Sequence, residues 1–301
     1  MKRTIQRLKD FMNESGKSQN QIAKELGLSG ATISQFLDGS YKGDNGRIAT
    51  DIENYLALAF ERNLSTDKTV FNVNLMNTKK VLFACRYAHK SNDIALVSGA
   101  AGAGKTTALR YYRDNNPGTL YIEATPCMTS TKSILRAIGK SIGKNIITNA
   151  DEFLEEICKS LRGSNRLIIM DEADHLPFKA LQLLRSINDR AGVGIILSGN
   201  DRIYTQMTTG QKSYELEQLK TRIIVKSKVS NEYTAEELTV IFPLLDSRAV
   251  LVMAVIAENE SLRSARKIYN IACELLEEGK GKITTGLLMT AQRNILGTVY
   301  K

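Results

Sequence analysis

Two patterns of apolar residues alternate along the middle of the chain. Short runs of consecutive apolar residues have the length of strands that are buried on both faces. These runs are residues 94–97, 119–124, 167–170 and 194–199. Between them, apolar residues recur at helical spacing in residues 107–112, 133–142 and 151–162. Strands that alternate with helices predict an α/β fold with a parallel sheet.

The region before this alternation predicts two short helices joined by a tight turn. Ile22, Ala23 and Leu26 give the first helix one apolar face. Gly27 is expected to end that helix in the left-handed conformation that glycine tolerates. Ser29 is then expected to cap the second helix.

The second helix has an apolar and a polar side. Ile33, Phe36 and Leu37 are expected to pack inward, and the residues expected to face outward are Gly30, Thr32, Ser34 and Gln35. Residues 18–39 resemble repressor-type helix-turn-helix domains, whose second helix enters the major groove. DNA contacts are therefore expected from Thr32, Ser34 and Gln35, with backbone contacts from Arg3, Lys17, Lys42 and Arg47. The alternative is a small helical domain that contacts protein.

A phosphate-binding loop stands between the first strand and the next helix. Residues 99–106 match G-x-x-x-x-G-K-T, and this order lets backbone N–H groups and a helix N-terminus surround phosphates. Lys105 is expected at the β- and γ-phosphates of ATP, and Thr106 at Mg²⁺. The residues expected to bind the nucleotide are Gly99, Gly102, Ala103, Gly104, Lys105, Thr106 and Thr107.

A pair of acidic residues follows the strand-like run at 167–170. A carboxylate at the end of a parallel strand points into the crevice where α/β sheets bind ligands. Asp171 is expected to assist Mg²⁺ and to bind the nucleotide, and Glu172 is expected to polarise the attacking water. The alternative is an acidic cap on the following helix. The phosphate-binding loop upstream favours the catalytic interpretation.

Composition narrows the class of protein. The chain has 301 residues, with 43% hydrophobic and 24% charged residues, typical of a globular protein. No apolar run is long enough to span a membrane, and the first residues lack the core of a signal peptide. The cysteines are far apart in the sequence and form no C-x-x-C pair, namely Cys85, Cys127, Cys158 and Cys273. Reduced thiols in a cytosol are expected, and His89 and His175 are expected to be structural.

The positive charge is concentrated in the middle of the chain. Residues 73–230 contain 23 Lys/Arg and 14 Asp/Glu, a net charge of +9. Residues 1–62 have a net charge of +1, and residues 231–301 have a net charge of −1. A basic core suggests a polyanionic partner such as double-stranded DNA, and the alternative is a solvated basic face without a partner.

Three further positions resemble functional residues of the AAA+ ATPases. Asn200, after the run at 194–199, resembles sensor 1, which orients water or senses the γ-phosphate. Arg222 stands where these proteins carry an arginine finger that acts on a neighbouring subunit. Arg263 resembles sensor 2, with Arg266 as its rival. Structural salt bridges are the alternative for all three arginines.

Four parts of the chain are expected, with the linker placed where the sequence turns polar after Phe60. These are a helix-turn-helix domain at 1–62, a linker at 63–72, an AAA+ core at 73–230 and a helical lid or partner-contact domain at 231–301. The sequence Asp171-Glu172-Ala173-Asp174 also occurs in DEAD-box helicases. Those enzymes carry Ser-Ala-Thr as their next motif, whereas this chain has Ser198-Gly199-Asn200, and no second RecA-like domain is expected. A processive helicase is therefore not expected.

The order of the domains and several connecting segments resemble the family of bacteriophage Mu B-type target-DNA activators. The segments are Tyr41-Lys42-Gly43-Asp44-Asn45-Gly46-Arg47, Arg86-Tyr87-Ala88, Thr125-Pro126, Asp171 through Leu176, and Gly199-Asn200-x-Arg202-x-Tyr204. The resemblance implies an ATPase that polymerises as helical filaments on DNA with little sequence preference. It also implies delivery of that DNA to a transposase, which stimulates hydrolysis and disassembly, in the cytoplasm of a bacterial host.

Basic residues of the core are the expected phosphate contacts in such a filament. Lys132 is the first candidate, and Arg185 and Arg190 are weaker ones, with surface charge as the alternative. The net negative charge of residues 231–301 favours a lid and protein-contact role over DNA binding. Two other functions remain open, a helicase loader and a transcription regulator whose ATPase core gates the helix-turn-helix.

Overall fold

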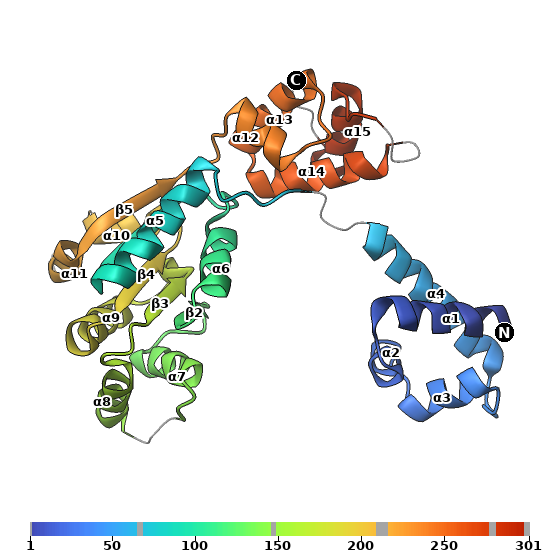
Figure 1. Cartoon of the computed structure of the whole chain (residues 1–301), viewed down its shortest axis with the longest axis horizontal. Coiled ribbons are helices and arrows are strands. Elements are labelled where there is room, and N and C mark those ends of the chain that lie inside the picture. The colour runs from blue at the N-terminus through green and yellow to red at the C-terminus, as the bar shows by residue number, and fades with distance from the viewer. Residues whose placement is uncertain (1, 65–68, 146–148, 209–215, 277–280, 298–301) are drawn as a thin grey trace. The chain divides into compact units, whose positions relative to one another are not determined.

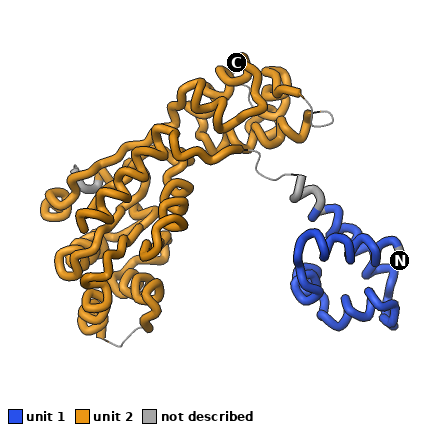
Figure 2. Tube along the Cα trace, in the orientation of Figure 1, with its two compact units in different colours: residues 1–67 blue, residues 68–301 orange. Residues whose placement is uncertain are grey.

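A computed structural model describes residues 2–64, 69–145, 149–208, 216–276 and 281–297. The chain divides into two units, residues 1–67 and residues 68–301 (Figure 2). The last helix of the front domain continues to Leu64, two residues beyond the expected end of this domain at residue 62. No helix among the described residues combines the length and hydropathy needed to cross a bilayer.

The first unit consists of helices around one small core. The helices are α1 (Lys2–Ser15), α2 (Gln19–Glu25), α3 (Gly30–Asp38) and α4 (Asn45–Leu64) (Figure 1). Each contributes buried apolar side chains, among them Leu8, Ile22, Phe36 and Ile52. Because the apolar residues of each helix recur at helical spacing, they line one face and pack together.

The turn between α2 and α3 has the geometry that its residues predict. Gly27 has a φ of 68°, and the Ser29 side chain accepts a hydrogen bond from the Thr32 N–H at the start of α3. Gly30, expected to face outward, is half-buried. A Cβ at Gly30 would lie 2.2 Å from Oδ1 of Asn20, so a larger residue here would require the Asn20 side chain of α2 to move.

The second unit contains a five-stranded parallel sheet, which confirms the expected α/β fold. The strands are β1 (Ile94–Gly99), β2 (Thr119–Glu123), β3 (Leu167–Asp171), β4 (Gly194–Ser198) and β5 (Ile223–Val229). Their order across the sheet is β2-β3-β4-β1-β5. Every strand pair is parallel, so all carboxyl ends lie at the same edge of the sheet.

Helices cover both faces of this sheet. On one face lie α7 (Thr131–Ser141), α8 (Ala150–Leu161) and α9 (Phe178–Ala191), whose apolar residues pack against Ile168 and Met170 of β3. On the other face lie α5 (Met76–Ser91) and α6 (Lys105–Asn115), which pack against Leu167 and Ile169. Alternate residues of one strand therefore serve two cores, which explains why its apolar residues are consecutive.

The remaining helices complete the second unit. A short 3₁₀ helix, η1 (Ala173–His175), follows β3, and α10 (Asp201–Thr208) and α11 (Glu217–Arg222) lie between β4 and β5. The C-terminal helices are α12 (Ala235–Ile241), α13 (Ser247–Asn259), α14 (Leu262–Glu274) and α15 (Thr285–Leu296). They enclose a core of their own that includes Phe242 and Tyr269 (Figure 1).

The stability of the sheet is testable with one substitution at two positions. Ile169→Ala removes a fully buried side chain at the centre of β3, and we expect a loss of about 2–5 kcal/mol in the free energy of unfolding. Ile224→Ala on the edge strand β5 removes a side chain that is 66% exposed, and we expect a change within about 0.5 kcal/mol. Denaturant unfolding measures both. Equal losses at the two positions would contradict the core assignment.

Candidate nucleotide site

The phosphate-binding loop connects β1 to α6 at the carboxyl edge of the sheet. Gly99 has a φ of 136°, and a Cβ there would lie 1.9 Å from the carbonyl oxygen of Val229 in β5. Gly104 takes a left-handed conformation with a φ of 88° immediately before α6. The loop therefore needs glycine for a close backbone approach at its start and for a tight turn at its end.

Lys105 lies buried beneath this loop. Its Nζ donates hydrogen bonds of 2.9 Å to the carbonyl oxygens of Gly99 and Ala100. Burial lowers the pKa of Lys105, and the nearby carboxylates of Glu172 and Asp171 oppose that shift. The ammonium group is therefore held at the loop by carbonyl oxygens, a kind of contact that phosphate oxygens can replace.

Asp171 is the most highly hydrogen-bonded side chain of the site. Oδ2 accepts from the hydroxyls of Thr106 at 2.8 Å and Tyr121 at 2.7 Å. Oδ1 accepts from the Ser198 hydroxyl at 2.8 Å and the Glu172 N–H at 3.1 Å. A carboxylate has about four acceptor positions, so these donors satisfy a group that is only 1% exposed.

Tyr121 is a site residue that the sequence did not reveal. It lies on β2 opposite Ile169 of β3, and its ring lies beneath the guanidinium groups of Arg110 and Arg113, 5.6 and 5.4 Å from its centroid. Burial, followed by the charge of Asp171, raises the pKa of Tyr121, so its hydroxyl remains a donor. A tyrosine in a strand is common in any sheet, and no motif distinguishes it.

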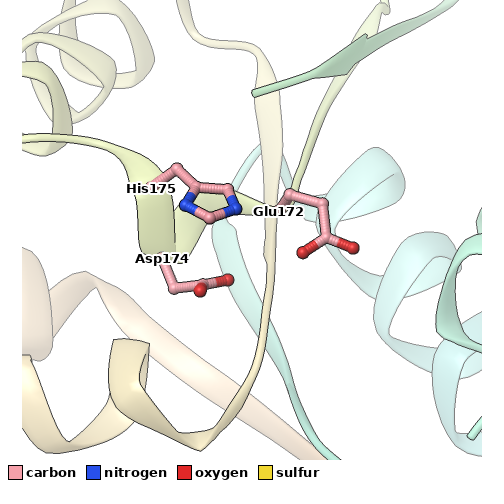
Figure 3. Close-up of side chains that lie close together, drawn as sticks. All are labelled: Glu172, Asp174 and His175. Atoms are coloured by element: carbon pink, nitrogen blue, oxygen red, sulfur yellow. The ribbon is translucent and has the colours of Figure 1, made fainter. Parts of the chain in front are cut away.

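Glu172 follows Asp171 in a left-handed conformation, with a φ of 53°, which is uncommon for a residue with a side chain. Burial raises the pKa of Glu172, and the carboxylates of Asp171 and Asp174 raise it further. Glu172, Asp174 and His175 lie together, with one ligand atom of each within 4.8 Å of the others (Figure 3). The site thus presents a partly exposed carboxyl whose proton is held more tightly than usual.

Asn200 lies at the end of β4, beside the end of β3, as expected. Its Nδ2 donates to Oδ2 of Asp174 at 2.7 Å, and its backbone N–H donates to Oδ1 at 3.2 Å. Its own Oδ1 accepts from the Arg202 N–H at 2.8 Å. The amide is therefore fixed in orientation next to the acidic cluster.

The C-terminal helices contact the phosphate-binding loop directly. A Cβ at Gly102 would lie 2.8 Å from Cβ of Ser261 and 3.2 Å from Cβ of Arg263, at the start of α14. The Tyr233 hydroxyl donates to the carbonyl oxygen of Ala103 at 3.2 Å. The backbone of Arg263 therefore lies against the loop, whereas Arg266 lies one turn further along α14.

Arg222 lies at the opposite end of the sheet from this loop. It ends α11 immediately before β5, and Ile223 pairs with Ile94 at the start of β1, whereas the loop follows the other end of β1. Seven residues of β5 rise by about 20 Å, so Arg222 does not reach the nucleotide site of its own chain. One guanidinium nitrogen of Arg222 lies 3.2 Å from Oδ1 of Asp189.

Comparison with known proteins places this site in a family. Residues 88–207 match the family model of an AAA domain. The chain is 30% identical over 230 residues to the ATP-dependent target DNA activator B of Escherichia phage Mu, covering 76% of this chain and 73% of that protein. The corresponding protein of Escherichia phage D108 matches with the same identity and coverage. The chain belongs to the target DNA activator B family.

The chain is also similar to a bacterial prophage protein, and more distantly to two solved structures. The Mu-like prophage FluMu DNA transposition protein B of Haemophilus influenzae is 28% identical over 235 residues, covering 77% of this chain and 82% of that protein. A RuvB variant from Thermotoga maritima has a TM-score of 0.45 at 15% identity, covering 73% of this chain and 68% of that one. PCH-2 of C. elegans has a TM-score of 0.42 at 15% identity, covering 79% and 74% of the two chains.

Family membership and the AAA domain confirm that this chain is an AAA+ ATPase. The donor set of the site fits a magnesium ion as well as a nucleotide. Mg²⁺ prefers hard oxygen ligands, and the Thr106 hydroxyl and the Asp171 carboxylate are oxygens within hydrogen-bond distance of each other. The site therefore offers a hydroxyl ligand and a carboxylate that orients it.

The structure separates the basic residues expected to contact DNA. Lys132 lies exposed in the first turn of α7, and Arg190 is exposed near the end of α9. Arg185 instead donates to Gln182 at 3.0 Å and pairs at 3.2 Å with Asp189, the same carboxylate that Arg222 contacts. Its charge is therefore engaged within the protein.

In the front unit, two of the expected DNA contacts are also engaged. The Thr32 hydroxyl lies 2.8 Å from Oγ of Ser29, the cap of α3, and Lys17 pairs with Glu25 at 2.8 Å. Ser34 lines a hollow of about 410 Å³ with Lys9 and Asn13 of α1. Gln35 is exposed, and so are Arg3, Lys42 and Arg47. Of the α3 residues expected to contact DNA, Ser34 and Gln35 are thus exposed and Thr32 is half-buried.

The two histidines differ in environment: His89 is hydrogen-bonded within the protein, whereas His175 is exposed beside Glu172 and Asp174. His89 lies 3.0 Å from the Tyr112 hydroxyl through Nδ1 and 2.8 Å from the carbonyl oxygen of Asn165 through Nε2. No disulfide joins the four cysteines, and burial raises the pKa of Cys85 and Cys158.

The hydrogen bond from Tyr121 to Asp171 predicts a measurable loss. Tyr121→Phe keeps the ring beneath Arg110 and Arg113 and leaves one acceptor position of a buried carboxylate empty. We expect a loss of about 1–3 kcal/mol in the free energy of unfolding, because the bond is to a charged group. Tyr112→Phe is the matched control, since that hydroxyl contacts His89 and its loss is expected to cost about 0.5–1.5 kcal/mol. An unchanged free energy for Tyr121→Phe would contradict this account of Asp171.

Proposed function

We propose that this chain is an ATP-dependent, largely sequence-independent DNA-binding protein that assembles as filaments on target DNA and delivers that DNA to a transposase. ATP hydrolysis then drives disassembly, in the cytoplasm of a bacterial host. The names of its relatives, ATP-dependent target DNA activators, support the DNA and transposition parts of this proposal. The observation that carries the assembly part is the position of Arg222 at the end of the sheet remote from its own phosphate-binding loop.

Within one chain, the residues at the carboxyl edge have separate roles in this proposal. Lys105 binds the β- and γ-phosphates, and Arg263 approaches them from the C-terminal helices. The loop around the phosphates is shaped by Gly99, Gly102, Ala103, Gly104 and Thr107. Thr106 and Asp171 hold Mg²⁺, which supplies charge neutralisation on the phosphates when bound. Glu172 accepts a proton from the attacking water, and Asn200 orients that water from the neighbouring strand end.

Arg222 completes the site of a neighbouring chain in this proposal. A guanidinium near the γ-phosphate stabilises the charge that develops during phosphoryl transfer, with effects of about 10³–10⁵ in kcat in related enzymes. Because Arg222 is about 20 Å from its own loop, it acts only when a second chain brings its loop to that surface. ATP binding and assembly are then coupled through one residue.

DNA contacts in the proposed filament come from both units. Lys132 and Arg190 contribute from the core, where the excess of positive charge lies. On α3 we favour Gln35 over Thr32 and Ser34, because the Thr32 hydroxyl contacts Ser29 and Ser34 lines the hollow beside α1. Phosphate contacts of this kind give affinity without sequence preference and make it sensitive to salt.

Electron microscopy of the full chain with random-sequence duplex DNA tests the proposal. We expect continuous filaments with ATP, and none with ADP or with Lys105→Ala in ATP. Lys105→Arg is the matched control for charge at this position. Isolated particles in every state would contradict filament assembly.

Two other results would indicate a different function. A stable complex with a hexameric helicase would favour a helicase loader. Binding confined to one operator sequence would favour a transcription regulator whose ATPase core gates the helix-turn-helix.

The raised pKa of Glu172 predicts the pH dependence of hydrolysis. A base works only when deprotonated, so kcat is expected to rise with pH through the pKa of Glu172. That midpoint is expected above the ordinary value for glutamate of about 4.3, because burial and the carboxylates of Asp171 and Asp174 favour the protonated form. A pH profile of kcat at saturating ATP and Mg²⁺ measures it. An acid limb at or below the ordinary value would contradict the assignment.

A further inference from the structure

A row of basic residues follows the outer face of α7. Lys132, Arg136 and Lys140 recur every four residues and are all exposed (Figure 1 shows α7). The opposite face of this helix is buried against the sheet through Ile134, Leu135 and Ile138. Residues four apart lie one above the other on a helix, so the three cations form one line.

This row has no counter-charge of its own. The helix contains no acidic residue, and none of the three cations forms an ion pair within the parts of the chain that the structure describes. The neighbouring helix α8 does carry acidic side chains, and one of them, Glu156, pairs with Lys144 at 2.8 Å beyond the end of α7. The charge of the row is therefore available to an external anion.

The spacing of the row fits the backbone of a nucleic acid. Four residues of helix rise by about 6 Å, so the row is about 12 Å long. Phosphates on one strand of duplex DNA follow each other every 3.4 Å along the axis, so the row spans about three or four of them. No large hydrophobic side chain of α7 is exposed, which favours a phosphate surface over an apolar protein surface.

The strand before α7 connects the row to the nucleotide site. β2 supplies the Tyr121 hydroxyl to Oδ2 of Asp171, and the Ala124 N–H donates to the carbonyl oxygen of Asp171 at 2.8 Å. The helix then begins at Thr131, a few residues further along the chain. A ligand bound on α7 and a nucleotide bound near Asp171 would therefore both contact segments joined to β2.

We propose that Lys132, Arg136 and Lys140 form a contact surface for the phosphate backbone of double-stranded DNA. This inference rests on the proposed function and extends it from one candidate residue to a surface. Each cation neutralises one phosphate and releases the counterions of that phosphate.

The salt dependence of binding counts such contacts. The triple variant Lys132→Gln, Arg136→Gln, Lys140→Gln is compared with the wild type in ATP, on a random-sequence duplex, between about 50 and about 200 mM salt. Each phosphate contact contributes about 0.9 to the slope of log K against log salt, so we expect the slope to fall by about 2.7.

A matched control has the same change of charge on another helix. Lys79→Gln, Arg86→Gln, Lys90→Gln removes three exposed cations from α5, where exposed Met76 and Phe83 interrupt the basic residues. We expect the slope of this control to stay within about 0.5 of the wild type, since no direct contact is lost. The melting temperature of each variant checks that it is folded. If the triple variant unfolds, the three single variants replace it, and each is expected to lower the slope of log K against log salt by about 0.9.

The outcomes separate this inference from the proposed function. An unchanged slope for the α7 variants, or an equal loss for the α5 control, would overturn the inference while DNA binding by the wild type still stands. Failure of the wild type to bind duplex DNA in ATP would overturn both.

Discussion

The parallel sheet is the constraint on which the rest of the structure depends. Because every strand runs in the same direction, the ends of β1, β3 and β4 meet at one edge and bring together Gly99, Asp171 and Ser198. Because β5 is parallel to these strands, its beginning and the preceding Arg222 lie at the amino ends of the strands, away from the loop. A single chain therefore has the phosphate-binding loop and the candidate arginine finger about 20 Å apart.

Hydrogen bonding at Asp171 joins several elements at the carboxyl ends of the strands. A buried carboxylate is costly unless its acceptor positions are filled, and here donors come from α6, β2, β4 and the next peptide group. Glu172 lies next to Asp171. Burial, together with the negative charges of Asp171 and Asp174, raises the pKa of Glu172. Two adjacent carboxyl groups thus differ in environment, one fully hydrogen-bonded and one partly exposed.

The sequence predicted the elements whose signals are local. The phosphate-binding loop, the acidic pair after β3 and the polar end of β4 follow from consecutive residues, and the structure brings them to one edge. The apolar pattern of the sequence did not predict β5, because Lys226, Ser227 and Lys228 interrupt the kind of apolar run that marks the other strands. The contact of Tyr121 with Asp171 and the pairing of Arg222 with Asp189 join distant segments, so no local pattern indicates them. Arg185 and Asp189 lie four residues apart on α9, so helical spacing could have indicated their pairing.

The central claim is that each nucleotide site is completed by a neighbouring chain. Lys105→Ala and Arg222→Ala are each expected to be inactive in ATP hydrolysis on DNA. In an equimolar mixture, an intact loop from the Arg222→Ala chain meets an intact arginine from the Lys105→Ala chain at about a quarter of the interfaces, so partial activity is expected to return. A mixture as inactive as its two components, in assemblies shown to contain both, would contradict the claim.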